Sequence, residues 1–334
     1  MSRAKKTKAK AYLPDSSRIS RFSSPLSLAL VEATPGAKDP VDAITKRVRE
    51  FVRHSGIGEP PFPPAEFARL RKVTSIEYRN MVEDGRLIAS ETGFKMELRT
   101  DRPFQRTNFT CAHEVGHTFF YEAVPKMKYD RMTDVIRDNE EETLCNLAAS
   151  ELLMPLWSIK SVTRDYQPSP KSLIEISRIY DTSLTATAIR VLALRLWNAK
   201  FILWRCDGPD PRALWFAQPF SGLAYYPKLD IENSHSSGIR VAADSGGPVQ
   251  GEEWLCINNR YTYCTITSLR LENSAKVLSC IGPFQKKPRA IQTNASQLSM
   301  SNQYSCECNG TGSRILYRNG YSYSQPCRAE SHHP

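Results

Sequence analysis

The sequence predicts an α+β protein, in which a mainly helical part with a small sheet is followed by a β-rich part. Two observations lead to this prediction. In several stretches before residue 200, apolar residues recur at spacings of three and four, as they do on one face of a helix. From Phe201 onward, runs of aromatic and β-branched residues favour strands instead. Hydrophobic residues make up 40% of the 334 residues, which is enough to bury a core.

The chain begins with a basic segment. Residues 1–22 hold seven Lys or Arg side chains against a single acid, Asp15. The apolar run from Leu26 to Val31 is too short for a secretion signal, and Glu32 follows it at once. We therefore expect residues 1–35 to be a disordered basic tail, with an organelle transit peptide as the alternative.

Two helices and a small sheet are predicted next. Apolar residues recur at helical spacing over residues 40–54, and the Gly- and Pro-rich stretch 56–64 ends that helix. A second helix is predicted over 65–72. Turn residues and alternating polarity then predict strands over 87–89 and 94–98. This sheet comes just before the helix that carries the most informative motif.

That motif is H-E-x-x-H, formed by His113, Glu114 and His117 on a helix predicted over about 107–122. Positions i and i+4 of a helix lie on one face, so both imidazoles can reach one zinc ion. The carboxylate of Glu114 can then take a proton from a water molecule bound to that ion. The alternative is that the two histidines only form hydrogen bonds within the core.

A third metal ligand is expected on the next helix, predicted over about 139–155. A catalytic zinc usually has three protein ligands and one open position, and the other histidines lie at a helix end, in a loop and at the terminus. A carboxylate is therefore expected. Acids in a first helical turn suit the helix macrodipole, which accounts for Glu140 and can also account for Glu141. Glu142 aligns with Asn146 on a strip that we expect to face the H-E-x-x-H helix.

The remaining elements complete the α+β prediction. Helices are predicted over 172–180 and 184–200, and a hairpin around Asn319-Gly320 is predicted near the end. The two helices resemble a helix-turn-helix with Arg190 near a DNA groove, but a hairpin that packs the core is the favoured interpretation. About half of the net charge of +10 lies in the basic tail, so direct nucleic-acid binding is possible but not favoured.

Two segments of the sequence resemble the ImmA/IrrE family of zinc metallo-endopeptidases. They are R-T-N-F-T-C-A-H-E-V-G-H, ending at His117, and E-T-L-C-N-L-A-A-S-E-L-L-M-P, beginning at Glu142. The resemblance covers about residues 36–200 and implies a gluzincin-like domain that binds Zn²⁺. It also implies that Glu142, four residues before Asn146, is the third zinc ligand. Ala148 stands where the family has Phe, a departure that affects packing rather than chemistry.

The resemblance implies a substrate and a partner as well. Family members cleave or inactivate a transcriptional repressor, so the expected substrate is a protein regulator, such as a helix-turn-helix repressor. The alternative is a non-catalytic regulator that keeps the peptidase fold and binds DNA or protein. Candidates for the group that stabilises the oxyanion are Arg106, Tyr121 and Tyr129, and the sequence does not choose among them.

The expected domain organisation follows from the shift in character at Phe201. We expect a peptidase domain over 36–200 and a β-rich domain over 201–334, with a loose segment at 290–313. The β-rich part is expected to regulate the peptidase or select its substrate. The alternative is that its strands complete the peptidase fold.

The cellular compartment is predicted from the cysteines and from the apolar runs. The nine cysteines are an odd number without a secretion signal, which favours reduced thiols in the cytoplasm. No stretch of 18 or more apolar residues is present, so no membrane-spanning helix is expected. The oligomeric state is not predicted.

Overall fold

The structure is a computed structural model. It describes residues 22–123, 139–208, 211–218, 238–257, 260–282, 306–309, 313–318 and 321–326. The chain divides into two compact units, Met1–Gln285 and Lys286–Pro334, which are described separately. The predicted α+β class is confirmed, because helices dominate the earlier part of the first unit and sheets the later part.

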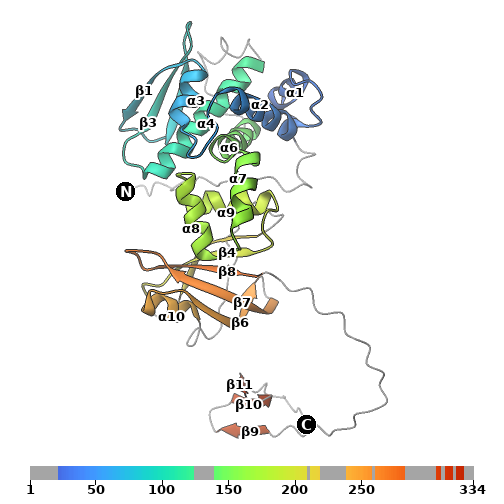
Figure 1. Ribbon diagram of the computed structural model, residues 1–334, viewed down its shortest axis with the longest axis vertical. Coiled ribbons are helices and arrows are strands. Elements are labelled where there is room, and N and C mark those ends of the chain that lie inside the picture. Colours follow the sequence, from blue (N-terminus) through green and yellow to red (C-terminus); the bar gives the residue numbers. More distant parts are fainter. Residues whose placement is uncertain are drawn as a thin grey trace, which may run out of the picture. The chain divides into compact units, whose positions relative to one another are not determined.

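The helices of the described residues are shown in Figure 1. They are α1 (Pro25–Glu32), α2 (Pro40–His54), α3 (Pro64–Leu70), α4 (Phe104–Ala123), α6 (Asn139–Leu153), α7 (Leu156–Val162), α8 (Pro170–Ile179), α9 (Leu184–Ala193) and α10 (Gly238–Ser245). The strands of the first unit are β1 (Val73–Arg79), β2 (Gly85–Ala89), β3 (Phe94–Arg99), β4 (Lys200–Arg205), β5 (Arg212–Ala217), β6 (Val249–Ile257), β7 (Arg260–Arg270) and β8 (Lys276–Ile281). None of the helices described combines the length and apolar character needed to cross a membrane.

Helix α1 corrects the expectation that residues 1–35 form a disordered tail. The side chain of Ser24 caps the helix by accepting from the backbone N–H of Ser27 (3.1 Å), and Pro25 occupies the first helical position. Leu30 is fully buried in the core, and this tertiary contact orders a segment too short to be recognised from its periodicity. Residues 1–21 lie outside the described residues.

The small sheet before the motif helix has the strand order β1-β3-β2. Strand β3 pairs in parallel with β1 and antiparallel with β2, and Leu87 lies opposite Met96. Met96 and Leu98 are buried, so one face of the central strand contributes to the core. The predicted strands near 87–89 and 94–98 are confirmed as β2 and β3, and β1 was not anticipated.

The helix predicted over 184–200 ends earlier than expected. Helix α9 ends at Ala193, because Arg195 adopts a left-handed backbone with a φ of 57°. The N–H of Leu196 then bonds back to the carbonyl of Val191 (3.0 Å), which closes the helix as a C-cap does. The chain continues into β4 at Lys200.

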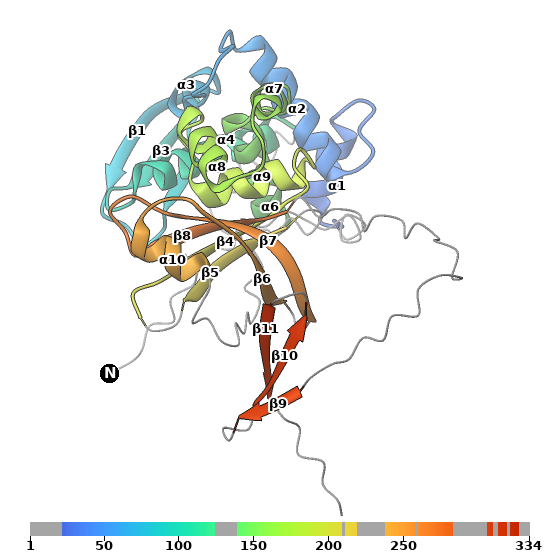
Figure 2. The same cartoon turned by 60° about the horizontal axis from the view of Figure 1, so that its bottom comes forward.

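The second sheet of this unit has the strand order β5-β4-β8-β7-β6, with all neighbours antiparallel. Helices α8 and α9 lie on one of its faces and α10 on the other (Figures 1 and 2). Phe201 and Leu203 join the main helical core, whereas Ile202 and Trp204 pack beneath α10. The hydrophobic core therefore runs across position 200, where the sequence predicts a domain boundary.

The described residues of the second unit form three short antiparallel strands in the order β11-β10-β9. These are β9 (Cys306–Asn309), β10 (Ser313–Arg318) and β11 (Tyr321–Pro326). The hairpin pairs Arg318 with Tyr321, as the sequence predicts. Strand β9 corrects the expectation that residues 290–313 are loose throughout, and the other residues of that range up to 312 lie outside the described residues.

Candidate metal centre

Helix α4 carries the histidine pair and Glu114. It begins after Pro103, whose carbonyl accepts from the backbone N–H of Thr107 (3.0 Å), so it starts about one turn earlier than predicted. One helical turn separates His113 from His117, and their ring centroids lie 5.0 Å apart. Both imidazoles therefore project from the same face of α4.

Helix α6 brings Glu142 to this face. Its carboxylate oxygens lie 3.3 Å from Nε2 of His113 and 3.7 Å from Nε2 of His117. One ligand atom from each of these three side chains lies within 4.8 Å of the other two, so the group could hold a metal ion. The side chains of His113, His117 and Glu142 are 13%, 12% and 29% exposed, respectively, so a substrate could still reach the ion.

The other nitrogen of each imidazole already has a partner from α6. Nδ1 of His113 lies 3.0 Å from Oδ1 of Asn146, and Nδ1 of His117 lies 2.7 Å from Oε1 of Glu141. Both partner atoms are acceptors, so each ring in its neutral form donates through Nδ1–H and keeps a lone pair on Nε2. Metal-binding histidines are oriented in this way, and the donor set therefore fits a cation such as zinc.

Helices α4 and α6 approach each other closely at Gly116. A β-carbon at this position would lie 3.1 Å from Cα of Cys145 and 3.2 Å from Cβ of Ala148. Such contacts are too close for an alanine without movement of α6. The glycine inside H-E-x-x-H thus lets the helix with Glu142 pack against the helix with the histidines.

Glu114 is buried and faces the start of β2. A β-carbon on Gly85 would lie 3.1 Å from Oε1 of Glu114 and 2.5 Å from Cγ2 of Thr110. Gly85 therefore leaves the space that the glutamate occupies. Because Glu114 follows His113 directly, its position beside the cluster depends on α4 and on β2.

A second group of possible ligands shares His117 with the first. It consists of His117, Glu141 and Cys145. Burial raises the pKa of the Cys145 thiol to about 12, so a metal would have to displace its proton. Burial lowers the pKa of His117, but the neighbouring Cys145 and the Glu141 carboxylate outweigh it and raise that pKa well above its usual range. We therefore assign His117 Nδ1 and Glu141 to a hydrogen bond rather than to a metal site.

The acidic run at the start of α6 has three different sets of contacts. Glu142 faces the histidine Nε2 atoms, Glu141 is buried against His117, and Glu140 points away to α1. Both oxygens of Glu140 accept from the backbone N–H of Ser23, and Oε2 also accepts from that of Ser24. In the sequence, the helix macrodipole accounts for Glu140 and can also account for Glu141, whereas the i+4 alignment with Asn146 and the family motif both indicate Glu142.

Other residues singled out in the sequence take structural roles. Arg106 forms an ion pair with Asp84, and Tyr121 packs against Phe94, whereas Tyr129 lies outside the described residues. Arg190 is buried and pairs with Glu151 of α6, so it is not available to a DNA groove.

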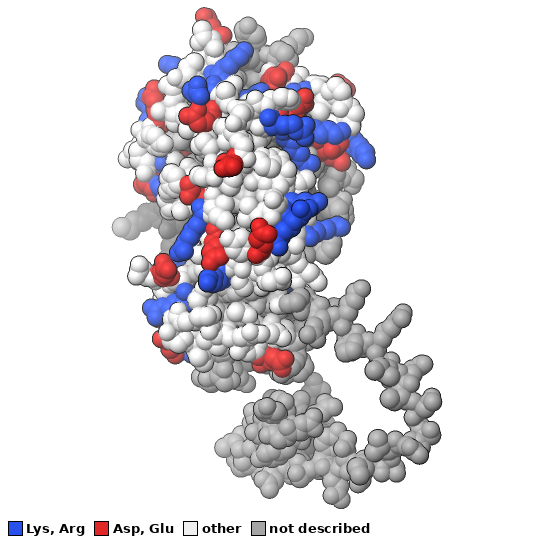
Figure 3. Space-filling model, in the orientation of Figure 1, with Lys and Arg blue, Asp and Glu red and all other residues white. Residues whose placement is uncertain are grey.

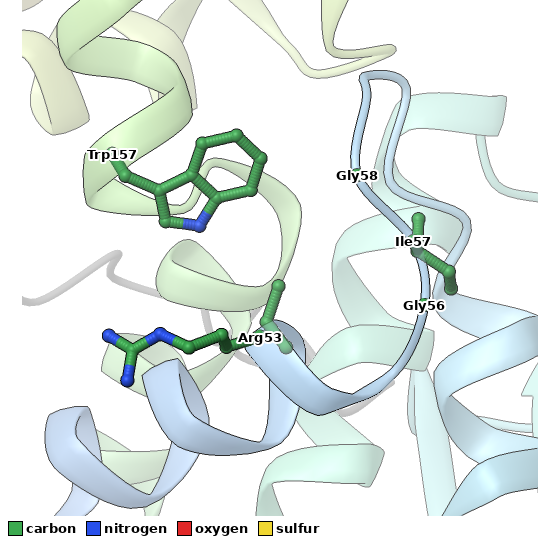
Figure 4. Close-up of a pocket in the computed structure, with 6 residues that line it drawn as sticks. Arg53, Gly56, Ile57, Gly58 and Trp157 are labelled. Atoms are coloured by element: carbon green, nitrogen blue, oxygen red, sulfur yellow. The ribbon is translucent and has the colours of Figure 1, made fainter.

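The surface offers two further observations. On the face shown in Figure 3, Lys and Arg side chains are interspersed with Asp and Glu side chains. A groove of about 390 Å³ lies between the end of α2 and the start of α7, with the indole of Trp157 on one side and Gly56 to Gly58 on the other (Figure 4). None of the residues that line this groove belongs to the metal-ligand group.

Comparisons with known proteins find two distant relatives. No protein-family model matches the chain. The radiation response metalloprotease IrrE of Deinococcus deserti is 34% identical over 98 residues, which cover 27% of this chain and 33% of that protein. The protein of the same name from Deinococcus radiodurans is 26% identical over 157 residues, covering 44% and 46% of the two chains. The matched part thus spans less than half the length of either relative.

One solved structure aligns more broadly but less closely. It is described as a Mycobacterium tuberculosis transcriptional regulator, and the alignment covers 71% of this chain and 75% of that chain. The identity is 10% and the TM-score 0.41, values too low to carry an argument about fold or function.

Proposed function

We propose that this chain is a zinc-dependent endopeptidase. Its zinc ligands are His113, His117 and Glu142, and Glu114 is its general base. The convergence of two Nε2 atoms and one carboxylate, while both Nδ1 atoms are held by other acceptors, is the observation that carries this proposal. The two relatives named as metalloproteases support the same class of activity.

The chain's own residues divide the work of peptide hydrolysis. When bound, zinc lowers the pKa of water to about 7 and polarises a carbonyl group. Glu114 takes the proton from the attacking water and later delivers it to the leaving amine nitrogen. Asn146 and Glu141 hold the two imidazoles in the tautomer that leaves Nε2 free. Burial of Glu114 restricts the positions that its carboxylate can adopt, and Gly85 leaves the space that it occupies.

A protein regulator is the proposed substrate. The partial exposure of the ligand group leaves room for a peptide segment to approach it. The resemblance to ImmA/IrrE peptidases favours a transcriptional repressor as the protein that is cleaved, and a cytoplasmic location is consistent with such a target.

The substitution Glu114→Gln tests the proposal. Glutamine is nearly isosteric but does not accept the proton, so we expect zinc to stay bound while cleavage is lost. Wild type and variant are incubated with the soluble proteome of the source cell, and new protein N-termini are identified by mass spectrometry. Elemental analysis checks that both proteins hold about one zinc per chain and that His113→Ala does not.

Three outcomes would contradict the proposal. If the wild-type protein holds no stoichiometric metal after purification with zinc present, the proposed metal centre is contradicted. New N-termini produced equally by Glu114→Gln would remove Glu114 as the base. A zinc-loaded wild type that cleaves nothing would favour the alternative, a regulator that keeps the peptidase fold.

A further inference from the structure

We propose that the start of helix α1 is a positioning element for the metal centre. The backbone N–H groups of Ser23 and of the N-cap residue Ser24 bind Glu140 (the grip) and so fix the turn of α6 that carries Glu141 and Glu142. This inference rests on the proposed function, since it names what holds a metal ligand in place. It assigns a role to a segment that contributes no side chain to the ligand group itself.

The contact between α1 and Glu140 uses the exposed amide groups at a helix start. Both carboxylate oxygens of Glu140 lie 3.0 Å from the backbone nitrogen of Ser23, and Oε2 lies 2.9 Å from that of Ser24. Ser24 is the N-cap of α1 and Ser23 precedes it, so neither amide has a partner within the helix, and the helix macrodipole favours a carboxylate at this end. The grip joins residues 116 and 117 positions apart in the sequence.

Helix α1 is itself anchored firmly enough to hold another element. Leu30 and Ser27 are fully buried, and Leu30 belongs to the main hydrophobic core. The carbonyl of Leu30 also accepts from the Thr34 hydroxyl (2.7 Å), so the end of the helix is tied as well. Helix α1 is therefore held in place by the core, and the N–H groups that bind Glu140 have a fixed position.

The grip acts on the ligands through the backbone of one helical turn. Glu140, Glu141 and Glu142 are consecutive, and each helical residue turns the chain by about 100°. A rotation or fraying of this turn would move Glu141 off His117 and Glu142 off both Nε2 atoms at once. The same first turn lacks intrahelical partners for its own amides, which makes it the part of α6 most prone to fraying.

This arrangement couples α1 to metal binding, because both depend on the fraction of molecules in which the first turn of α6 is ordered. If the ordered turn is populated only in part, apparent metal affinity falls by that fraction, and any contact that orders the turn raises it. The coupling is reciprocal, so bound metal must in turn stabilise the grip of α1 on Glu140.

A matched pair of substitutions at Ser24 isolates the grip. Ser24 has a φ of −64°, which proline adopts without strain, and Ser24→Pro removes the N–H that donates to Glu140. Ser24→Ala keeps that N–H but loses the same capping hydroxyl, so it is the control. We expect zinc affinity, measured by chelator competition on the full chain, to be roughly tenfold weaker in Ser24→Pro than in Ser24→Ala, the size of a typical cap. Glu140→Ala should show a similar loss.

Hydrogen exchange gives a readout that a purely structural helix would not produce. In the wild type, added zinc should slow exchange at the amides of Leu28 to Glu32, and this slowing should vanish in Glu140→Ala. Equal zinc affinities for the Ser24 pair, or α1 amides indifferent to zinc in a wild type that binds it, would overturn the proposal. Failure of the wild type to bind zinc would instead contradict the proposed function, so the two failures are distinguishable.

Discussion

The three glutamates at the start of α6 contact different groups, so replacing each by alanine should weaken zinc binding to a different extent. Glu142→Ala removes a proposed ligand and should cause the largest loss of zinc affinity. Glu141→Ala removes the acceptor for His117 Nδ1 and should weaken binding by roughly 10- to 100-fold, as outer-shell changes do. Glu140→Ala should cause the smallest loss of zinc affinity of the three. Chelator competition measures all three affinities.

An exposed glutamate supplies the control for this series. Glu175 pairs with Lys171 on the surface of α8 in a contact of 3.9 Å, and surface pairs contribute under about 1 kcal/mol. Glu175→Ala should leave zinc affinity unchanged. A larger loss at Glu141 than at Glu142 would move the third ligand by one residue.

Glu151 should make the fold sensitive to acid. Its carboxylate is fully buried and accepts from Arg49 and Arg190, which join α2 and α9 to α6. Burial raises its pKa, but the two arginines outweigh this and hold that pKa below the ordinary value of 4.5. The stabilisation is therefore complete above about pH 4.5 and is lost as the pH falls through the lower, folded-state pKa.

The substitution Glu151→Gln tests this effect. It leaves Arg190 buried without its charged partner, so we expect a loss of about 3–5 kcal/mol in the free energy of unfolding at pH 7. The difference from wild type should shrink as the pH drops below 4.5, as measured by urea unfolding across that range. A difference that stays constant down to pH 2 would contradict the assignment.

At the residue scale, the sequence predicts what one helix determines locally. The spacing of His113 and His117 places their rings on one face whatever the tertiary fold, and the structure has them so. The contacts of Glu140 and Glu141 depend on which helix lies opposite α6, and no local pattern contains that information. Asn146 stands out in the sequence by its i+4 spacing from Glu142 and by its place in the family motif, but neither signal predicts its contact with His113.

At the scale of elements, the packing of α4 on α6 depends on Gly116. Alanine favours a helix by about 1 kcal/mol over glycine, so Gly116→Ala would raise the free energy of unfolding if there were space for the methyl group. The contacts of 3.1–3.2 Å to Cys145 and Ala148 oppose it, and overpacking typically costs about 1–3 kcal/mol. We expect Gly116→Ala to lower the free energy of unfolding and to weaken zinc binding, because the helices that carry the ligands must separate.

Thermal unfolding and zinc competition check this prediction, with Gly58→Ala as the control, since a β-carbon there meets nothing within 4 Å. A Gly116→Ala protein that is more stable than wild type and binds zinc equally well would contradict the prediction, because it would show that a methyl group fits between α4 and α6.

Two helices that the sequence does not predict share a physical cause. Helices α1 and α10 are eight residues each, too short for periodicity to stand out, and both are ordered by buried side chains such as Leu30 and Ile239. The overlong helix after residue 184 arose because Arg195 has no sequence signal for a left-handed conformation. Long strands with aromatic and β-branched residues, such as β7, were found because local preference and tertiary burial agree.

For the whole molecule, the predicted boundary near residue 200 stays a prediction, and truncation tests it. Leu278 and Cys280 lie in the same core cluster as residues of α4 and α6, and the compact units divide after Gln285. We expect residues 1–285 to be folded and to bind zinc, and residues 1–200 to be insoluble or far less stable. Circular dichroism and metal content of the two fragments and the full chain decide this, and a stable, zinc-loaded 1–200 fragment would restore the earlier boundary.

The acidic triplet of α6 also affects how this chain can be compared with other proteins. In a run of three glutamates, an alignment shifted by one residue can still pair glutamate with glutamate. A ligand assignment transferred through such an alignment can therefore fall on the wrong glutamate. The carboxylates of Glu140, Glu141 and Glu142 face a helix start, a ring nitrogen and a ligand cluster, respectively. Correspondence at this turn therefore has to be read from the direction of each side chain, with Asn146 as a marker that fixes the reading frame.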